Sequence, residues 1–451
     1  MLATRSDSAV RHDLIEQLAD ARQRSDDLFS LVKPDSLYDR PIAERHRIIF
    51  YIGHLEAFDW NLFRECVLGL DSFHPEFDRL FAFGIDPVGG GLPTDRPAEW
   101  PSIAAVRHYV RNIRTVLDDK LAESIADPRL PTGDGFPLST LLNVAIEHRL
   151  MHAETLAYML HQLPLDKKIR ETEPLNVVTR PVAHRSIEIP AGTVTLGLPR
   201  GGGLFGWDNE YEAHSVNVPA FAIDQFKVTN QQYLEFISAG GYETRELWND
   251  GDNKNNNEAW NWKSRQGISQ PAFWKRQGNQ WLYRTMFEDI PLPLDWPVYV
   301  SQAEAKAYAR WAGKALPTEA EWQRAAYATP HGEERAYPWG SAEPADTFGN
   351  FDFARWNPVP VNAFPRGQSA FGVHGILGNG WEWTSTEFAP FSGFEPFPFY
   401  RGYSADFFDG KHFVMKGGSA RTAACMLRRT FRNWFQAHYQ FIYTGFRCIS
   451  R

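Results

Sequence analysis

The hydrophobic pattern changes character between the segment that ends near Leu165 and the segment that begins near Ile187. In the first segment apolar residues recur every three or four positions over long stretches, which is typical of amphipathic helices. In the second, short runs of β-branched and aromatic residues are broken by Gly, Pro and Asn, which is typical of strands and turns. Because 451 residues are too many for one ordinary core, the sequence predicts two domains. We expect an all-α domain over 1–165, a polar linker over 166–186 and an α+β domain over 187–451.

Four long helical stretches are predicted in the first domain, enough for a four-helix bundle. They cover residues 14–32, 45–68, 103–125 and 136–163. Between the second and third stretches, residues 84–101 are rich in Pro and Gly and form a long loop of the kind that often carries function. In the second domain we expect helices over 230–238, 301–312 and 318–328.

Charge and composition exclude several classes of function. The formal net charge of -8 argues against nucleic acid as the main partner, because phosphate binding needs clustered Lys and Arg. No stretch of eighteen or more apolar residues occurs, and the N-terminus has no apolar signal core, so we expect a cytoplasmic protein without a membrane partner. The three cysteines, Cys66, Cys425 and Cys448, give no disulfide framework.

Two histidines in the fourth helical stretch share one helical face. His148 and His152 are four residues apart, and at about 100° per residue they lie within about 40° of each other. A pair of imidazoles at this spacing can hold one metal ion. Glu147 and Glu154 fall elsewhere on the helix and are better interpreted as salt-bridge or supporting groups.

A third histidine, His54, lies in an apolar helical stretch, where an imidazole costs free energy unless it has a partner. Three neutral imidazoles would leave coordination positions open for oxygen and substrate. Buried or surface histidines without a metal remain the alternative, and imidazole suits both iron and zinc. The segment Asp250–Asn253 has a calcium-like composition but lacks the full loop pattern.

Strings of residues in both halves are recognisable. The first domain resembles DinB-like metal-binding four-helix bundles. The second resembles the formylglycine-generating-enzyme (sulfatase-modifying factor) fold, which is C-type-lectin-like. The strings that carry this second resemblance are Phe226-Lys227-Val228-Thr229-Asn230, Leu316-Pro317-Thr318-Glu319-Ala320-Glu321-Trp322, Gly378-Asn379-Gly380-Trp381-Glu382-Trp383-Thr384, Gly417-Gly418-Ser419 and Gly445-Phe446-Arg447-Cys448.

Both domains in one chain resemble the ergothioneine-pathway sulfoxide synthases, whose motifs recur as HRIIFYIGHLEAFDWN, EHRLMHAE and Thr430-Phe431-Arg432-Asn433-Trp434. The resemblance implies that His54, His148 and His152 bind iron(II). It also implies an O2-dependent reaction that joins the sulfur of a thiol donor to hercynine, the trimethylammonium form of histidine. Asn433 and Trp434 would help to hold hercynine, since an aromatic face attracts a quaternary ammonium group. Arg432 could hold a carboxylate.

The chain departs from the family at positions that contact the thiol donor. Members that use γ-glutamylcysteine have tyrosines after the Trp-Glu-Trp-Thr string, an aspartate after the Asn-Trp pair and a glutamine beside the last metal histidine. Here those places are Phe388 and Phe391, Phe435, and Met151. The departures favour free cysteine as the donor. Tyr400, Tyr403 and Tyr439 are candidates for the proton donor that Phe388 and Phe391 cannot be.

Three other functions remain open at this point. The first is a formylglycine-generating oxidase, which needs a close pair of cysteines such as Cys425 and Cys448. The second keeps the architecture but uses ovothiol-type or selenoneine-type substrates. The third is a non-catalytic binding module, because C-type-lectin-like folds often only bind ligands.

Overall fold

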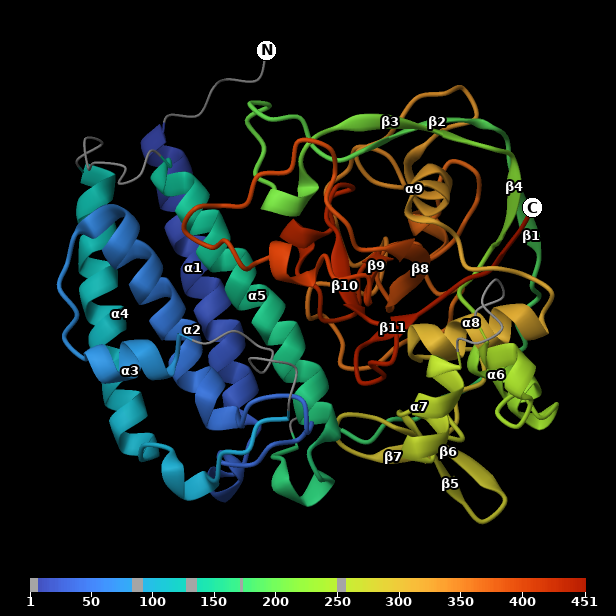
Figure 1. Cartoon of the computed structure of the whole chain (residues 1–451), viewed down its shortest axis with the longest axis horizontal. Coiled ribbons are helices and arrows are strands. Elements are labelled where there is room, and N and C mark those ends of the chain that lie inside the picture. The colour runs from blue at the N-terminus through green and yellow to red at the C-terminus, as the bar shows by residue number, and fades with distance from the viewer. Residues whose placement is uncertain (1–6, 83–91, 127–135, 171–172, 250–256) are drawn as a thin grey trace. The chain divides into compact units, whose positions relative to one another are not determined.

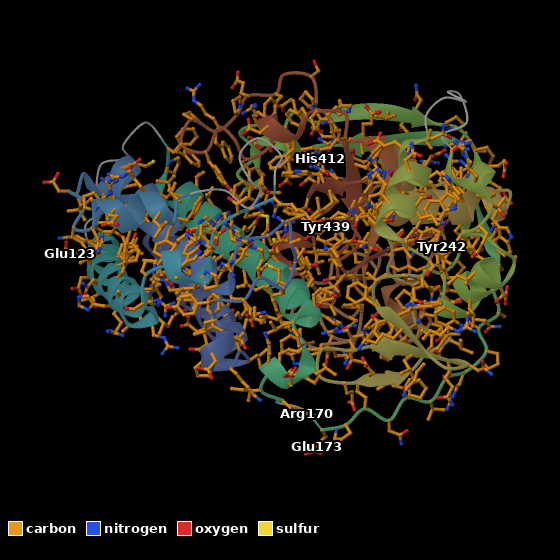
Figure 2. All side chains as sticks on the ribbon, turned by 60° about the horizontal axis from the view of Figure 1, so that its bottom comes forward. Glu123, Arg170, Glu173, Tyr242, His412 and Tyr439 are labelled. Carbon is orange, nitrogen blue, oxygen red and sulfur yellow. The ribbon has the colours of Figure 1, made fainter. Side chains whose placement is uncertain are left out.

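The computed structural model describes residues 7–82, 92–126, 136–170, 173–249 and 257–451. The chain forms two compact units, Met1–Thr172 and Glu173–Arg451. The first unit is helical, and the second contains strands, short helices and much irregular chain (Figure 1). Arg170 and Glu173, labelled in Figure 2, are the described residues on either side of the boundary. The predicted fold class, an all-α domain followed by an α+β domain, is confirmed.

Four long helices build the N-terminal unit. They are α1 (Asp7–Ser30), α2 (Ile48–Phe63), α4 (Ile103–Ala126) and α5 (Leu138–Gln162), and a short helix, α3 (Pro75–Leu80), precedes α4. Helix α5 packs against α1 and α2, and α2 also packs against α4. Almost every side chain of α2 is buried, which explains why its sequence is apolar on all sides rather than on one stripe.

Local signals set the helix ends. The Ser102 hydroxyl accepts a hydrogen bond from the N–H of Ala105 and caps the start of α4. Pro137 stands immediately before α5, where its fixed φ suits a helix start. The last carbonyl groups of α5 at Leu160 and His161 accept hydrogen bonds from the ammonium of Lys168.

The polar segment predicted as a linker is attached at both of its described ends. The N–H of Ile169 donates to the carbonyl of Leu31 in the helical unit. Further along, the N–H of Leu175 donates to the carboxylate of Glu288 in the C-terminal unit. Within this segment, only residues 171–172 lie outside the described chain.

Four antiparallel or mixed sheets build the C-terminal unit. The first joins β1 (Ser186–Ile189), β4 (Phe221–Asp224) and β12 (Ile449–Ser450); the second joins β10 (Asn433–Gln436), β9 (His412–Lys416), β8 (Trp381–Glu387) and β11 (Thr444–Gly445); the third pairs β2 (Gly192–Leu196) with β3 (His214–Val218); the fourth joins β5 (Trp274–Gln277), β6 (Gln280–Arg284) and β7 (Asp289–Pro291). Strand β10 is an edge strand, because β9 is its one neighbour in that sheet.

Three helices of this unit begin with the same device. In α6 (Asn230–Ser238), α8 (Gln302–Trp311) and α9 (Glu319–Tyr327), a Ser or Thr at the N-cap and a Gln or Glu three residues later bond each other's backbone N–H groups. The recognisable string Leu316–Trp322 therefore includes a whole capping box, and the string Phe226–Asn230 includes the N-cap residue Thr229 of another. A fourth helix, α7 (Glu258–Gln266), follows a segment outside the described residues.

A buried carboxylate, Glu382 on β8, joins three of the recognisable strings. It accepts two hydrogen bonds of 2.7 Å from Arg447, one of 2.9 Å from the Trp322 indole and one of 3.0 Å from Lys227. Gly380 is required nearby, because a Cβ there would lie 2.6 Å from the Tyr299 ring and the backbone has a φ of +112°.

Helix α7 and the β5–β7 sheet were not predicted, because their residues show neither a clear period of 3.6 nor a clear alternation. The predicted loop over 84–101 is described only from Leu92, where Asp95 pairs with Arg40 and Arg47. Its earlier residues, and the calcium-like segment Asp250–Asn253, lie outside the described chain.

Candidate metal centre

Three histidine side chains meet inside the helical unit. His54 comes from α2, and His148 and His152 come from α5. One ring nitrogen from each lies within 4.8 Å of the others, and the three residues are at most 3% exposed. The Nε2 atoms of His54 and His152 are 3.2 Å apart. The structure thus brings together all three of the histidines that the sequence nominated as ligands.

Burial keeps these imidazoles neutral. It lowers the pKa of His54 to about 4 and holds the pKa values of His148 and His152 well below the ordinary value, because a buried imidazolium loses its hydration. A neutral imidazole carries one lone pair for a metal ion, whereas an imidazolium carries none. At neutral pH the three rings are therefore in the protonation state that a metal ion needs.

The orientation of His54 is set by a backbone carbonyl. Its Nδ1 donates to the carbonyl oxygen of Phe81 at 2.7 Å. A neutral ring that donates from Nδ1 must carry its lone pair on Nε2, the atom that faces His152. Metal-bound histidines commonly donate their second ring nitrogen to a carbonyl or carboxylate in this way.

Aromatic residues of α2 line the three imidazoles. The Phe50 ring stacks on His54 with centroids 4.9 Å apart, and the Phe58 ring stacks on His148 at 3.5 Å. The Tyr51 ring lies 5.8 Å from that of His152. One helix therefore provides both a candidate ligand and three of the rings that surround the ligands.

The arrangement passes a simple test for a metal ion. Two nitrogens that each lie about 2.1 Å from one ion are roughly 3 Å apart when their bonds meet near a right angle. The separation of 3.2 Å between the Nε2 atoms fits that value. Among the residues that the structure describes, no carboxylate joins the group, so the donor set is three neutral imidazoles. Such a set leaves positions open for ligands other than protein.

A buried ion cluster beside the histidines was not predicted. The Arg149 guanidinium bonds the carboxylates of Glu56 at 3.0 Å and Asp59 at 2.6 Å, and all three side chains are at most 1% exposed. Arg114 also bonds Glu56, at 2.6 Å. Because Arg149 is on α5 and both carboxylates are on α2, the cluster fixes the register of the two helices that carry the histidines. The sequence did contain a signal for this cluster. Glu56 and Asp59 lie in an apolar helix, and buried carboxylates need a cation as partner.

The C-terminal candidates are divided between two faces of strand β10. Side chains of adjacent strand residues point to opposite faces, so Asn433 and Phe435 share one face and Trp434 points to the other. On the first face, the Phe435 ring stacks on Tyr439 at 5.2 Å. On the second, the Trp434 indole stacks on Phe388 at 4.1 Å with the rings nearly parallel. Asn433 and Trp434 were expected to hold the same substrate, and the alternation gives them to different faces of the strand.

Arg432 was expected as a possible carboxylate ligand, and in the structure it already pairs with a carboxylate of the chain itself, that of Glu319. Its side chain is 2% exposed, and it bonds both oxygens of Glu319 and the carbonyl groups of Asn209 and Ala389. The guanidinium also lies 4.0 Å from the centre of the Phe391 ring. Sequence alone could not show this, because Glu319 is more than a hundred residues away.

The three candidate tyrosines have different surroundings. Tyr403 is buried and stacks on Trp207 with centroids 3.9 Å apart. Burial, together with the nearby Asp208 carboxyl, raises the pKa of Tyr400 to about 12. Tyr439, labelled in Figure 2, is half-buried beside Phe435. Met151, half-buried on α5, directly precedes His152.

Neither cysteine of the C-terminal unit forms a disulfide. Cys425 is exposed in a 3-10 turn, whereas Cys448 is fully buried next to β12. Burial raises the pKa of the Cys448 thiol well above its ordinary value. These surroundings differ from the reactive pair that a formylglycine-generating oxidase needs.

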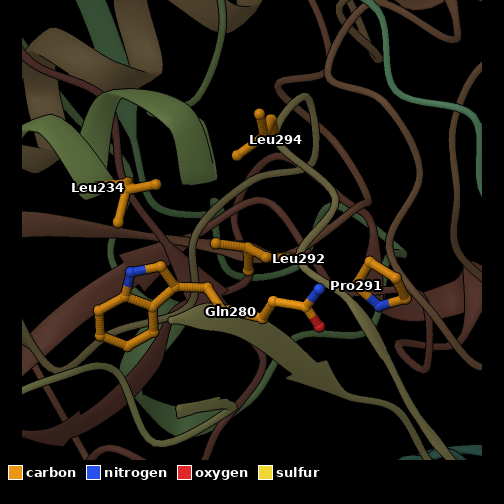
Figure 3. A pocket seen from close by; sticks show the side chains of 6 residues that line it. Leu234, Gln280, Pro291, Leu292 and Leu294 are labelled. Atoms are coloured by element: carbon orange, nitrogen blue, oxygen red, sulfur yellow. The ribbon is translucent and has the colours of Figure 1, made fainter. Parts of the chain in front are cut away.

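An apolar hollow of about 280 Å³ lies elsewhere in the C-terminal unit (Figure 3). It is lined by Leu234, Gln280, Trp281, Pro291, Leu292 and Leu294. None of the predicted site residues lines it.

Over the described part of the chain, every helix is too short or too polar to cross a bilayer.

Comparison with known proteins gives both domains a family. Residues 17–156 match the DinB superfamily, and residues 174–451 match the sulfatase-modifying factor enzyme 1-like domain. The chain is 36% identical to the hercynine oxygenase of Mycobacterium tuberculosis over 77% of each chain. It is 35% identical to that of Mycolicibacterium smegmatis over 97% of this chain and 98% of the relative. A formylglycine-generating enzyme of Mycobacterium tuberculosis is 34% identical but covers only 47% of this chain.

Proposed function

Because this chain belongs to the hercynine oxygenase family of ergothioneine biosynthesis, we propose that it is an iron(II)- and O2-dependent sulfoxide synthase acting on hercynine and a thiol donor. The reaction forms one carbon–sulfur bond to the imidazole ring and leaves the sulfur as a sulfoxide. With cysteine as donor, hercynine, cysteine and O2 give the coupled sulfoxide and one water. The carbon–hydrogen and sulfur–hydrogen bonds are broken, and O2 takes up the four electrons.

The observation that carries the proposal is the buried group of three neutral imidazoles. His54, His148 and His152 would hold the metal through one nitrogen each. A bound iron(II) ion would supply the redox chemistry with O2 and would lower the pKa of a coordinated thiol. Zinc could lower the thiol pKa but could not react with O2, because it has no redox chemistry. Phe50, Tyr51 and Phe58 limit water at the ligands and hold the rings in place.

We assign hercynine to the face of β10 that carries Asn433, with Tyr439 as the proton donor that best replaces the family tyrosine. Asn433 offers an amide to a carboxylate or imidazole. Tyr439 stacks on Phe435 and therefore lies on the side of Asn433. Trp434, which stacks on Phe388, supports this strand from behind.

The proposed donor is free cysteine rather than γ-glutamylcysteine. At Phe435 the aspartate that contacts the longer donor in other members is absent, and the Phe435 ring is held against Tyr439. Phe388 is 1% exposed and stacked on Trp434, so it offers no polar group in place of the family tyrosine. An apolar, filled position at Phe435 favours a smaller donor.

The test is reconstitution of the purified full chain with iron(II) without oxygen, followed by oxygen, hercynine and either cysteine or γ-glutamylcysteine. Mass spectrometry should detect the coupled sulfoxide with cysteine, and much less with γ-glutamylcysteine. A product only with γ-glutamylcysteine would overturn the donor assignment. Oxygen consumption that yields only cysteine sulfinic acid would reject the coupling role. Histidine in place of hercynine, or a selenium donor in place of cysteine, tests the ovothiol and selenoneine alternatives in the same assay.

A further inference from the structure

The hydrogen bond between His54 and the Phe81 carbonyl depends on the short helix α3, because Phe81 is the residue that ends this helix. Phe81 follows α3 directly, and its N–H bonds the carbonyl of Phe77 inside that helix. The position of the Phe81 carbonyl therefore follows the position of α3. A turn and a half of helix has little stability of its own, so something else must hold it in place.

That attachment is Asp78, in the middle of α3. Its carboxylate is 5% exposed and accepts hydrogen bonds from the Tyr109 hydroxyl at 2.6 Å and the Trp60 indole at 3.2 Å. It also accepts one from the Ser72 hydroxyl. Because Tyr109 is on α4 and Trp60 is on α2, one carboxylate ties α3 to two long helices of the bundle.

A second contact brings the Phe81 backbone close to His54. Phe81 is fully buried, and its ring lies over Gly53, the residue before His54. A Cβ at position 53 would lie 2.5 Å from the Phe81 ring, so only glycine allows this approach. Gly53 is inside α2, where glycine costs about 1 kcal/mol relative to alanine. That cost is consistent with a close approach that the site needs.

We propose that Asp78 is a positioning residue of the metal centre, acting through α3 and the Phe81 carbonyl to fix the His54 tautomer with Nε2 free for the ion. The inference rests on the proposed metal-binding role of the three histidines. Gly53 also positions the Phe81 carbonyl, because the absence of a side chain at position 53 leaves room for the Phe81 ring. Neither residue is one of the three proposed ligands. Gly53 lies in the recognised string HRIIFYIGHLEAFDWN, directly before His54, whereas Asp78 lies outside every recognised string.

The experiment compares four full-length variants with the unaltered chain. Asp78→Ala removes the attachment, Asp78→Asn keeps one acceptor oxygen, and Gly53→Ala displaces the Phe81 ring. Leu121→Ala is the matched control, because Leu121 is a fully buried residue of α4 outside this arrangement, and its truncation lowers stability without touching α3. For each variant the unfolding free energy and the affinity for cobalt(II), from competition with a chelator, are measured together.

Loss of a group that orients a metal ligand typically lowers metal affinity about 10- to 100-fold. We expect that loss for Asp78→Ala and Gly53→Ala, a smaller loss for Asp78→Asn, and less than about a twofold change for Leu121→Ala at a similar loss of stability. A second readout is the ¹⁵N spectrum of labelled histidine in the zinc-loaded chain. In the unaltered chain His54 should show a protonated Nδ1, and in Asp78→Ala this signal should weaken or move.

The outcomes separate the two proposals. If the unaltered chain takes up no divalent metal, the metal centre and its positioning residue are both rejected. If the unaltered chain binds cobalt(II) and Asp78→Ala binds it as tightly as Leu121→Ala does, the metal centre stands and the role of Asp78 is rejected. An unchanged His54 tautomer in Asp78→Ala would lead to the same rejection.

Discussion

Each unit of the protein buries a group of polar side chains, and the two groups are built on opposite principles. Around Glu382 in the C-terminal unit, opposite charges are paired: the cations of Arg447 and Lys227 face one carboxylate, and Lys227 also donates to the carbonyl of Gly378. Although burial alone would raise the pKa of Glu382, the two cations lower it. Around His54 in the helical unit, three neutral imidazoles turn their nitrogens toward one another.

The difference separates a scaffold from a site. A buried polar group that serves the fold finds its partners within the chain, as Glu382 does. Imidazole nitrogens placed 3.2 Å apart can share at most one proton between them, so they gain little from each other and much from a cation between them. The helical unit contains both principles, because the matched Arg149 cluster lies beside the histidines and fixes the helices that carry them.

The largest effect should come from removing one imidazole of the site. His152→Ala should abolish iron binding and coupling together, because two histidines on different helices hold an ion far more weakly than three. Metal content after dialysis and product by mass spectrometry provide the two measurements. His108→Ala on the exposed face of α4 is the control, and it should keep both. Full turnover by His152→Ala would contradict the ligand assignment.

Most of the histidine site could be predicted from the sequence, because it follows from the local spacing of residues along helices. The four long helices follow from apolar spacing, and His148 and His152 share a face by helical geometry alone. His54 was nominated because an imidazole in an apolar helix needs a partner, and the resemblance assigned it to the same ion, but no local spacing places it opposite the other two. The Phe81 carbonyl could not be predicted, because a backbone oxygen leaves no mark in the residue type. The match of Glu382 with Lys227 joins residues more than 150 positions apart, and no local period records it.

The next effect tests the scaffold. Glu382→Gln leaves Arg447 and Lys227 buried without their carboxylate, which should lower the free energy of unfolding by about 3–5 kcal/mol. Iron bound per folded molecule should stay unchanged, since the helical unit supplies the ligands. Chemical denaturation and metal analysis of the same sample measure both. Glu387→Gln, at the exposed end of the same strand, should change neither. Loss of iron from folded Glu382→Gln would remove the distinction between scaffold and site.

Asp208 is intermediate between the paired carboxylate of Glu382 and the neutral histidines, and its raised pKa predicts that stability depends on pH. It is fully buried, but its partners are neutral, namely the Ser404 hydroxyl and the Asn209 backbone, and burial raises its pKa to about 6. Between about pH 4 and 6 the unfolded chain has lost this proton while the folded chain keeps it. Stability contributed by the protonated form is therefore lost as pH rises, by up to about 3 kcal/mol at pH 6 and above.

Asp208→Asn cannot titrate and removes that loss. The stability of the unaltered chain relative to Asp208→Asn should fall as pH rises from about 4 to 6 and stay level above that range. Urea unfolding at a series of pH values measures the difference. A constant difference across this range would show that Asp208 is already charged at pH 4, as a carboxylate with cationic partners is.

The smallest predicted effects concern the two faces of β10. Asn433→Ala should raise the KM for hercynine about tenfold, the equivalent of one hydrogen bond to a charged group, with kcat changed less. Trp434→Ala should raise it only about two- to threefold, because it removes the support behind the strand, and Phe388→Leu should do the same by removing the other half of that stack. Since adjacent side chains of a strand point to opposite faces, we expect hercynine to contact Asn433 directly and Trp434 only through the strand. A larger rise for Trp434→Ala than for Asn433→Ala, with Phe388→Leu unchanged, would reverse the assignment and place the trimethylammonium group against the indole.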